Sequence, residues 1–585
     1  MKRMKKLFKK IWPIILVIFF SLLPLKFVFQ EGFFPMHDDA QTVRVAQMGK
    51  ALSEGQFPVR WVSDLGYGWG YPIFNFYNPL PYYFGGMLNF FGLNALVATK
   101  IMIVIGFLLA GIGMYLLAEK LFGKFAGIIS AIFYVYAPYH AIELYVRGSI
   151  GEMWAYGILP FVFWGLAKKN CFITGISLAC LILSHNLTAM MTLPLILVVM
   201  IISSVIPDSS VIPDSSVIPD SSVIPAKAGI YKNNYLYRFR IKSGMTKCIS
   251  STLLLALGLS AFFWLPAVFE KKYTGVDAMI SEKFNPLEHF VYPQQFWNSI
   301  WGYAGSAPGM LDGMSFQIGK LHILISLAAI VLVFYLLGKT KKLPKFAICI
   351  LGLLVFSIFM MVSLSRPIWQ FLPLLNYLQF PWRFLIFTAF STSLLAGWLI
   401  FIFKKRKLKR VFIYGIFILF LGGLLFLNLK YFSPQFLYEA EAEDFLKEEK
   451  IRWDASSASD EYLPAELKKP EAKDFLFKDK YILYAGGEIK ENKRISTLYD
   501  LTISSPKENI LTINNAYFPG WQAWISGQPV KVDHADYLIN LKIPEGEHNV
   551  LVKFTNTPIR IIANTISLVS FLVLLYFFIR FTPPR

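Results

Sequence analysis

Charged residues and cysteine are both scarce in this chain of 585 residues. Asp, Glu, Lys and Arg together make up 16% of the sequence, whereas hydrophobic residues make up 55%. A soluble protein of this length carries a larger charged share. The four cysteines include no CxxC pair, which argues against a disulfide framework and against a thiolate zinc site. These absences make a membrane protein the first class to consider.

Long apolar runs account for the low charge. Runs long enough to cross a bilayer as helices lie at 11–29, 97–117, 249–268, 321–338, 346–363, 384–403, 411–427 and 560–580. Shorter apolar stretches lie at 125–139, 153–167, 171–184 and 187–203. The sequence therefore predicts a mainly α-helical polytopic membrane protein with about twelve transmembrane helices.

Basic residues outnumber acidic ones, 57 against 37, and many of them form short clusters between the apolar runs. The clusters include residues 1–10, 168–170, 339–345 and 404–410. Counting through the spans from a cytoplasmic N-terminus places all of these clusters inside, as the positive-inside rule expects. Because the basic residues are divided among short loops, they argue against nucleic acid as a partner.

The polar segments divide the chain into regions. Residues 1–429 form the predicted transmembrane domain, with a first outward loop at 30–95. Alternating apolar residues and turn sequences such as "PEGEH" predict an extracytoplasmic, β-sandwich-like domain with some helix at 430–557, before a last helix and tail at 558–585. Pro recurs at every sixth position in "SSVIPDSSVIPD", which excludes a helix and predicts a low-complexity cytoplasmic insertion at 203–247.

The stretch "PMHDDAQ" (35–41) places His37, Asp38 and Asp39 side by side just after the first apolar run. The residues that follow have an apolar stripe at helical spacing and predict a helix along the membrane surface. One of the two aspartates would suffice as its N-cap, with Gln41 completing a capping-box-like pattern. Three titratable side chains exceed what a cap needs, and a carboxylate where membrane helices meet water is a candidate functional group.

Longer motifs along the chain are similar to those of one family. They are "HD" after the first span, "GQFPVRW" (55–61), "YGWGYPIFNFYNPLPYY" (67–83), "GMYLLAEKLFG" (113–123), "YAPYH" (136–140), "RGSIGE" (147–152), "LSHN" (183–186) and "FPWRF" (380–384). With these motifs the chain resembles the bacterial polytopic membrane proteins labelled "6-pyruvoyl-tetrahydropterin synthase-related". The pterin chemistry of that label is not expected, because it needs zinc held by clustered histidines, and this chain has seven scattered His and no HxH.

The architecture resembles, more distantly, the GT-C superfamily of integral-membrane glycosyltransferases. Members of that superfamily have an acidic motif in the first outward loop, many spans and often a C-terminal outward β-domain. The resemblance implies a multi-pass protein of the bacterial cytoplasmic membrane that transfers a sugar from a polyprenyl-phosphate donor. It also implies an acceptor on the outer face, namely an envelope glycan, lipid or protein, and inversion at the sugar carbon.

Such a transfer needs a base for the acceptor, a cation for the departing phosphate and a groove for the lipid. The resemblance implies that Asp38 is the catalytic base, since superfamily members place a carboxylate in this loop. His37 or Asp39 is expected to support it. Asp38 and Asp39 are also candidate ligands for Mg²⁺ or Mn²⁺, because these ions prefer oxygen ligands.

Three arginines near the outer ends of predicted spans are candidates for the phosphate, because a guanidinium can bind two phosphate oxygens. They are Arg383, Arg366 and Arg147, with Arg383 the first choice, and anchoring at the membrane interface is the alternative for each. Other polar and aromatic side chains are expected to line the substrate pocket: Tyr71, Asn75, Tyr77, Asn78, His140, Glu143, Glu152 and His185. An interfacial aromatic belt is the alternative for the rings.

Two other functions remain open from the residues. A transporter or flippase of lipid-linked sugars would need charged or broken helices at mid-membrane, and the predicted spans carry few charges at their centres. A non-catalytic scaffold for envelope assembly would need only the outward β-domain.

Overall fold

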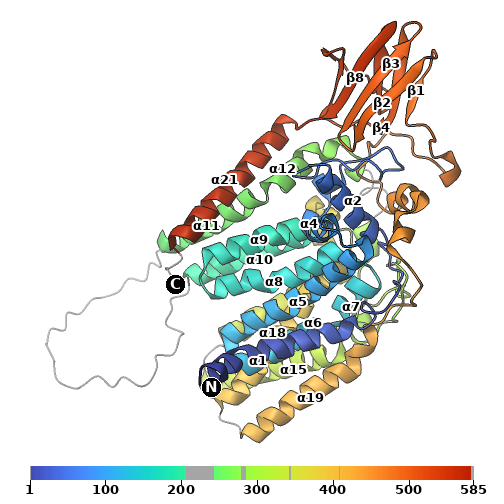
Figure 1. Cartoon of the computed structure of the whole chain (residues 1–585). Helices are drawn as coiled ribbons and strands as arrows, with labels where there is room; N and C mark the ends of the chain where they lie inside the picture. The colour runs from blue at the N-terminus through green and yellow to red at the C-terminus, as the bar shows by residue number, and fades with distance from the viewer. Residues whose placement is uncertain (1, 206–242, 278–284, 342–343, 407–408, 582–585) are drawn as a thin grey trace.

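The computed structural model describes residues 2–205, 243–277, 285–341, 344–406 and 409–581. The body is a bundle of helices with a β region at one end (Figure 1). Helix α1 (Lys2–Leu22) begins, and helix α21 (Pro558–Phe581) ends, at the opposite end of the bundle (Figure 1). Most of the predicted insertion at 203–247 lies outside the described residues, while its two ends belong to helices.

Six helices among the described residues are long and apolar enough to cross a bilayer. They are α5 (Ala95–Phe122), α8 (Ile150–Ala167), α15 (Lys320–Thr340), α18 (Leu385–Lys405), α19 (Arg410–Asn428) and α21. α5 and α8 pack against each other and α18 is the most buried, whereas α19 and α21 expose most of their apolar surface. Such a surface is suited to lipid hydrocarbon.

Other apolar helices are bent or short. Three helix pairs bend at a short break: α6 (Lys124–Val135) with α7 (Pro138–Tyr145) by 45°, α11 (Ser243–Leu259) with α12 (Ala261–Glu270) by 72°, and α16 (Lys345–Met361) with α17 (Arg366–Phe371) by 84°. The shorter ones, with apolar parts of 10–17 residues, are α1, α9 (Cys171–Ser184) and α10 (Asn186–Val205).

A helix occupies each of the twelve predicted apolar segments, so the mainly α-helical, polytopic prediction is confirmed. The number of spans is smaller than predicted. Within the described ranges there are six candidate spans, or nine if each bent pair is one span. A helix of fifteen residues is only about 22 Å long, which is less than the ~30 Å of a typical hydrocarbon core.

The cysteines depart from expectation at one position. Cys180 and Cys349 are free, but Cys171, at the start of α9, is disulfide-bonded. The absence of a CxxC pair therefore did not exclude a disulfide.

The first loop, residues 26–94, contains α2 (Gln41–Ser53), α3 (Ile73–Phe76) and α4 (Pro79–Phe90). α2 packs closely against α4, because Gly49 and Gly86 leave no side chain between them. A Cβ at Gly86 would lie 2.3 Å from the side chain of Met48. The predicted helix is present as α2, but Gln47, which the helical spacing places opposite the apolar stripe, is buried rather than exposed.

The β region forms two antiparallel sheets before α21, as predicted. One sheet has the order β1-β4-β7 and the other β2-β3-β8-β5-β6. The strands are β1 (Tyr481–Leu483), β2 (Glu488–Ile495), β3 (Leu498–Ser505), β4 (Asn509–Ala516), β5 (Trp521–Ile525), β6 (Gln528–Val530), β7 (Leu538–Ile543) and β8 (Gly546–Phe554). Alternate residues of β3 and β7 are buried, and the Tyr499 hydroxyl donates to Asn515 of the other sheet at 2.7 Å.

Residues 432–480, which lead into the strands, contain short helical turns: η8 (Ala442–Leu446), η9 (Lys450–Asp454), α20 (Ala455–Ser457) and η10 (Lys473–Phe475). Short helices near the middle of the chain include α14 (Pro293–Trp297) and, before α18, η5 (Pro373–Leu378). The predicted β-sandwich-like region is thus preceded by a mostly irregular segment.

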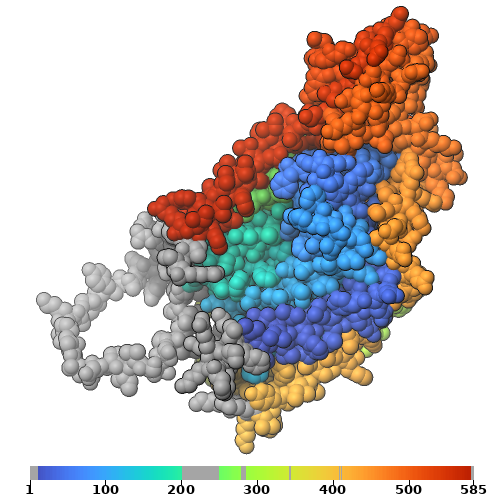
Figure 2. All heavy atoms as spheres, in the orientation of Figure 1, coloured from blue at the N-terminus to red at the C-terminus, as the bar shows by residue number. Residues whose placement is uncertain are grey.

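The first loop and the C-terminal region are packed together. Figure 2 shows first-loop atoms, in blue, directly beneath the orange β region. The buried ring of Trp61 contacts the rings of Trp521 and Phe554, and Tyr67 donates to Asp460 at 2.9 Å. Trp521, in the motif "FPGWQAW", is therefore a core residue of this junction. The two regions predicted to lie outside the membrane, 30–95 and 430–557, therefore pack against each other.

Candidate functional site

A cavity of about 660 Å³ opens where the first loop meets the ends of several helices and residues 458–462. We call it the Asp38 cavity. Seven predicted site residues line it: His37, Asp38, Tyr77, Asn78, Arg147, His185 and Arg383. They come from parts of the chain that are up to 346 residues apart, a separation given by 383 minus 37, so the fold brings these side chains together.

Asp38 is held between a cation and a hydroxyl. Nη1 of Arg44 lies 2.8 Å from each carboxylate oxygen of Asp38, and the Tyr77 hydroxyl donates to Oδ2 at 2.7 Å. The Arg44 side chain is 2% exposed and the Asp38 side chain is 25% exposed. The carboxylate is therefore fixed from the protein side while part of it faces the cavity.

Asp38 is not a helix cap. The N-cap of α2 is Ala40, and no side chain caps the helix. Gln41 turns its amide away from a capping box and donates to the backbone oxygens of Asp38, at 3.1 Å, and Gly148, at 2.8 Å. The backbone N–H of Asp38 donates to the carbonyl of Arg147 at 3.0 Å. The loop is thus tied to the residues before α8, and the capping alternative is wrong.

Two arginines and a shared glutamate form the facing wall. Oε2 of Glu152 accepts from Nη1 of Arg147 at 2.9 Å and from Nη1 of Arg383 at 2.5 Å. Glu143 forms a second ion pair with Arg147, and the Tyr139 hydroxyl donates to Oε1 of Glu152 at 2.6 Å. Both glutamate side chains are fully buried. They hold the guanidinium groups in place from behind the cavity.

The two arginines differ in what remains for a ligand. Arg383 uses all three nitrogens: Nε donates to the Leu378 carbonyl at 2.8 Å, Nη2 to Gln379 at 2.9 Å, and Nη1 to the glutamate. Within the described ranges, both hydrogen bonds of Arg147 use Nη1. Its Nε and Nη2 remain for a ligand, and its guanidinium lies 4.7 Å from the Trp382 ring centroid.

Five predicted pocket residues lie behind the lining of the Asp38 cavity. Glu143 and Glu152 brace the arginines, as described above. Tyr71 is buried and donates to the Ser459 carbonyl at 3.0 Å, while Asn75 accepts from Arg60 at 2.8 Å. His140 is buried between two aromatic rings. These side chains support the wall but do not contact the cavity space, because tertiary packing covers them.

Asp39 and Arg366 also lie outside the lining of this cavity. Asp39 faces Lys450 at 3.6 Å, and its Oδ1 is buried without a partner. Burial raises the pKa of Asp39 to about 6, against the opposing effect of the Lys450 charge. Arg366 is exposed and donates to the Leu287 carbonyl at 3.2 Å. Adjacent position in the sequence, or a place at a helix end, was not enough to direct these side chains inward.

The predicted Mg²⁺ or Mn²⁺ site does not fit the side chains. Asp38 and Asp39 pair with different cations, Arg44 and Lys450. Among the described residues, no three His, Cys, Asp or Glu side chains gather where they could hold a metal ion. Two carboxylates already neutralised by basic side chains make a poor divalent-cation site.

Sequence reasoning missed several lining residues, notably Arg44, Glu461, Lys271 and Tyr377. Glu461 is a second carboxylate in the cavity; burial raises its pKa, and the Ser459 hydroxyl donates to it at 3.2 Å. Arg44 carried one usable signal, a charge inside the apolar run "VRV". Lys271 directly follows α12, Tyr377 lies in η5 and Glu461 lies in the segment after α20, so no shared pattern pointed to them.

One side of the Asp38 cavity is apolar. Leu187, Met190, Ala267, Val268 and Leu374 contribute to the lining there. Val268 is 56% exposed and Leu374 is 61% exposed. They belong to the two sharply bent regions around α12 and α17, so the bends place apolar side chains at the rim.

Comparison with known proteins gives distant matches. No family model matches the chain. An uncharacterized protein of Lactococcus lactis subsp. cremoris (strain MG1363) is 24% identical over 389 residues, which cover 63% of this chain and 54% of that protein. The chain thus spans about half the length of the curated relative it matches. The predicted resemblance to the 6-pyruvoyl-tetrahydropterin synthase-related proteins stays a prediction.

Similar solved structures belong to the Archaeoglobus fulgidus oligosaccharyltransferase. Its apo form gives a TM-score of 0.42 at 15% identity, over 81% of this chain and 62% of that chain. The form tethered to an acceptor peptide gives 0.43 at 14%, over 81% and 61%. The complex of AglB with an inhibitory peptide and a dolichol-phosphate gives 0.41 at 14%, over 81% and 62%. At these values the similarity carries no conclusion about the activity of this chain.

Proposed function

We propose that the protein is a membrane glycosyltransferase that moves a sugar from a polyprenyl-phosphate donor to a hydroxyl of an envelope acceptor, with inversion. One observation carries the proposal: the Asp38 carboxylate and the guanidinium groups of Arg147 and Arg383 line the same cavity. A base and a phosphate-binding cation are the two groups that this transfer requires.

Arg147 is the residue we assign to the donor phosphate. Its free Nε and Nη2 give a two-pronged donor that matches two phosphate oxygens. Each nitrogen of Arg383 already donates one hydrogen bond, so we assign it the role of adding positive charge and holding Glu152. This reverses the order expected from the sequence, in which Arg383 came first.

Asp38 is assigned to the acceptor hydroxyl. In the step, Asp38 takes the hydroxyl proton, the acceptor oxygen forms a bond to the anomeric carbon, and the bond from that carbon to the phosphate oxygen breaks. The released polyprenyl phosphate keeps the electron pair, and its charge is stabilised by Arg147. Arg44 and Tyr77 fix the carboxylate in one orientation, which keeps it aligned with the reacting hydroxyl.

The apolar side of the cavity is assigned to the first units of the lipid chain. Val268 and Leu374 are exposed apolar residues at the rim. An exposed apolar edge next to a polar cavity suits a ligand with a charged head and a hydrocarbon tail. The outer face of the membrane and the cytoplasmic N-terminus remain predictions from the basic clusters.

The test compares Asp38→Asn with Glu31→Gln, which neutralises an exposed carboxylate elsewhere in the first loop. Each variant is expressed in a strain that lacks the protein, and surface glycans and polyprenyl lipids are measured by mass spectrometry. Asp38→Asn is expected to leave the glycan unmodified and to let lipid-linked sugar accumulate, because no base then takes the proton from the acceptor hydroxyl. Glu31→Gln is expected to restore the glycan. Restoration by Asp38→Asn at normal protein level would refute the assignment.

Glu461 provides an internal check on the choice of base. It is the other carboxylate that lines the cavity, and it is less strongly held than Asp38. If Glu461→Gln abolishes transfer and Asp38→Asn does not, the base is Glu461 and the role of Asp38 is positioning.

A transporter of lipid-linked sugars is the second candidate, because three helix pairs in the described residues are bent at short breaks. Broken helices are typical of transporter binding sites. The same lipid analysis separates the two functions. A flippase defect traps lipid-linked sugar on the cytoplasmic side, whereas a transferase defect lets it accumulate on the outer side.

A further inference from the structure

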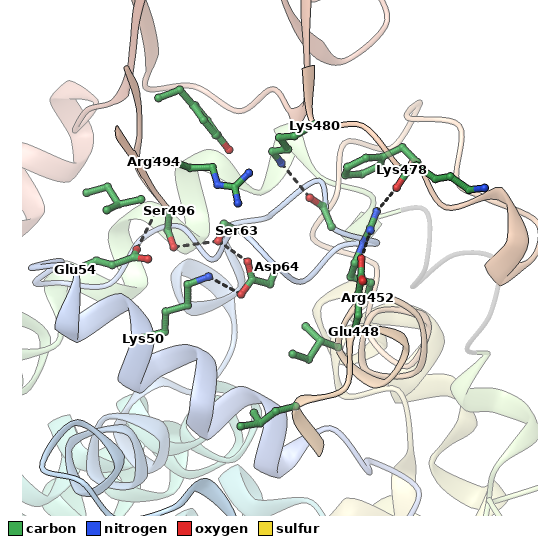
Figure 3. A pocket seen from close by; sticks show the side chains of 16 residues that line it. Lys50, Glu54, Ser63, Asp64, Glu448, Arg452, Lys478, Lys480, Arg494 and Ser496 are labelled. Atoms are coloured by element: carbon green, nitrogen blue, oxygen red, sulfur yellow. Dashed lines mark hydrogen bonds and ion pairs between the residues drawn. The ribbon is translucent and has the colours of Figure 1, made fainter. Parts of the chain in front are cut away.

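A second cavity, of about 570 Å³, lies between the C-terminal part of α2, residues 63–68 of the first loop, and residues 446–499. We call it the Lys480 cavity. Figure 3 shows side chains from these three segments pointing toward its centre. It is separate from the Asp38 cavity, since the two share no lining residue.

Basic side chains outnumber acidic ones around the Lys480 cavity. Five basic residues line it: Lys50, Arg452, Lys478, Lys480 and Arg494. Three acidic residues line it: Glu54, Asp64 and Glu448. Five minus three leaves an excess of two positive charges. All three acids already have partners, because Asp64 accepts from Lys50, Glu54 from the backbone of Ser496, and Glu448 from Arg452 (Figure 3).

Lys480 has no carboxylate partner among the described residues, and Arg494 has one long ion pair. Nζ of Lys480 donates to the backbone carbonyls of Asn514, at 2.7 Å, and Gly68, at 3.2 Å. No carboxylate of the described residues pairs with it. Arg494 points into the cavity (Figure 3) and pairs with Glu491 at 3.5 Å, with half of its own side chain exposed. One cation without a carboxylate partner among the described residues and one with a long, partly exposed ion pair therefore face one space.

Aromatic rings lie beside these cations. The ring centroid of Phe477 is 4.3 Å from the Arg452 guanidinium and 5.5 Å from Nζ of Lys480. Tyr499 lies 5.7 Å from the same Nζ. Both rings line the cavity, but Tyr499 is fully buried against Trp521, so Phe477 is the ring open to a ligand. Aromatic faces pack against the C–H surfaces of sugars, while adjacent cations bind anionic substituents.

We propose that the Lys480 cavity binds an anionic saccharide, that is, a sugar unit carrying a phosphate or a carboxylate. Lys480 and Arg494 bind the anionic group, and Phe477 contacts the sugar ring. The volume is in the range of small-ligand sites. The anion supplies the negative partner that Lys480 lacks in the free protein and a second negative partner for Arg494.

The position of the cavity suggests what such binding is for, and this part rests on the proposed transfer. The rise along α2 from Arg44, in the Asp38 cavity, to Lys50, in the Lys480 cavity, is about 9 Å. Residues 446–462 contribute to both cavities. A glycan held by its anionic group at Lys480 therefore presents neighbouring sugars to Asp38. The binding itself does not depend on catalysis.

The experiment measures binding to the full-length protein in detergent, carrying Asp38→Asn so that no transfer occurs. The probes are a tetramer of galacturonic acid, its neutral methyl ester, a tetramer of glycerol phosphate, and inorganic phosphate. At least one anionic tetramer is expected to bind about tenfold or more tightly than the methyl ester, since a hydrogen bond to a charged group is worth ~1.5–3 kcal/mol. The carboxylate and phosphate probes identify which anion is preferred.

Substitutions then locate the binding. Lys480→Met and, separately, Arg494→Gln are each expected to weaken the preferred tetramer about tenfold. Lys531→Met, which removes an exposed lysine outside the cavity in the same β region, is expected to change nothing. Arg494 is half exposed, so its variant tests the proposal even where Lys480→Met lowers folding.

The pH dependence gives an independent readout. Burial lowers the pKa of Lys480 to about 7, with repulsion from Arg494, Arg452 and Lys50 and a smaller opposing effect of Asp64. A bound anion favours protonated Lys480, so affinity is expected to be full well below pH 7 and to fall about tenfold between pH 6 and pH 8. Lys480→Met is expected to flatten this profile.

Two results would overturn the proposal. One is equal affinity for the methyl ester and both anionic tetramers. The other is anion binding that Lys480→Met and Arg494→Gln leave unchanged. Binding of inorganic phosphate as tightly as the tetramers would overturn the saccharide part, because Phe477 would then contribute nothing. None of these outcomes bears on whether Asp38 catalyses transfer, which the glycan analysis tests separately.

Discussion

The Asp38 cavity and the Lys480 cavity both gather basic side chains, but they hold them differently. In the first, Arg147 and Arg383 are fixed from behind by buried glutamates. In the second, Lys480 is held by backbone carbonyls and Arg494 by one half-exposed ion pair with Glu491 at 3.5 Å. A cation that is already neutralised and oriented suits chemistry at a defined atom, whereas an uncompensated cation suits capture of an anion.

Removing a guanidinium from the Asp38 cavity is expected to give the largest effect on activity. Arg147→Met removes the free donors that we assign to the phosphate, and transfer is expected to fall ~10²–10³-fold, the usual loss for one stabilising donor. Arg147→Lys is expected to recover only part of it, because a point charge does not match two oxygens. Glycan mass spectrometry or turnover of a lipid-linked sugar measures the loss.

Arg366→Met is the matched control for Arg147→Met. Arg366 is also an arginine near a predicted span end, but it is exposed and lies outside the cavity. It is expected to keep nearly full transfer. An equal loss in both variants would show that a basic membrane anchor, and not a phosphate contact, is what these arginines provide.

Removing a carboxylate is expected to lower the stability of the protein at the Asp38 cavity but not at the Lys480 cavity. Glu152→Gln leaves two buried arginines with one carboxylate, and breaking a buried ion pair costs about 3–5 kcal/mol. Glu448→Gln removes an exposed partner of Arg452 and is expected to leave the melting temperature unchanged. The Glu448 side chain is 75% exposed and that of Glu152 is 0% exposed. Thermal unfolding in detergent compares them.

If Glu152→Gln and Glu448→Gln have the same melting temperature, Glu152 is not structurally required, and the comparison between the cavities fails. A double variant, Glu152→Gln with Arg383→Gln, sharpens the result. It removes one charge of each sign, so it is expected to recover part of the stability lost in Glu152→Gln.

The sequence was informative wherever periodicity or charge directly determines structure. Apolar length predicted the helices, and strand alternation with turn signals predicted the antiparallel sheets. The burial of a given side chain could not be predicted in the same way, because it depends on which surfaces of the folded chain meet. The motif "HDD" pointed to Asp38, yet nothing in the local sequence distinguishes it from Asp39, which faces Lys450 instead.

The Lys480 cavity could not be predicted from local patterns at all. It forms between the first loop and the β region, and its lining residues are up to 449 positions apart, a separation given by 499 minus 50. From the sequence, each lysine and arginine of this cavity is predicted to be an ordinary solvent-exposed residue. Only tertiary packing removes Lys480 from water and leaves it without a carboxylate.

Asp39 offers the smallest and most specific test of how the first loop is packed. Burial raises its pKa to about 6 from an ordinary value near 3.8. The folded protein therefore binds the proton more tightly than the unfolded chain, and stability declines as pH rises through the interval from about 4 to 6. Asp39→Asn, which cannot ionise, is expected to lose that decline and to be slightly more stable than the parent at pH 7. Melting temperatures of both proteins at pH 4.5, 5.5 and 7 measure the difference. A variant whose melting temperature falls at pH 7 would mean that the pair with Lys450 outweighs burial, so that Asp39 would be a structural ion pair and not a strained neighbour of Asp38.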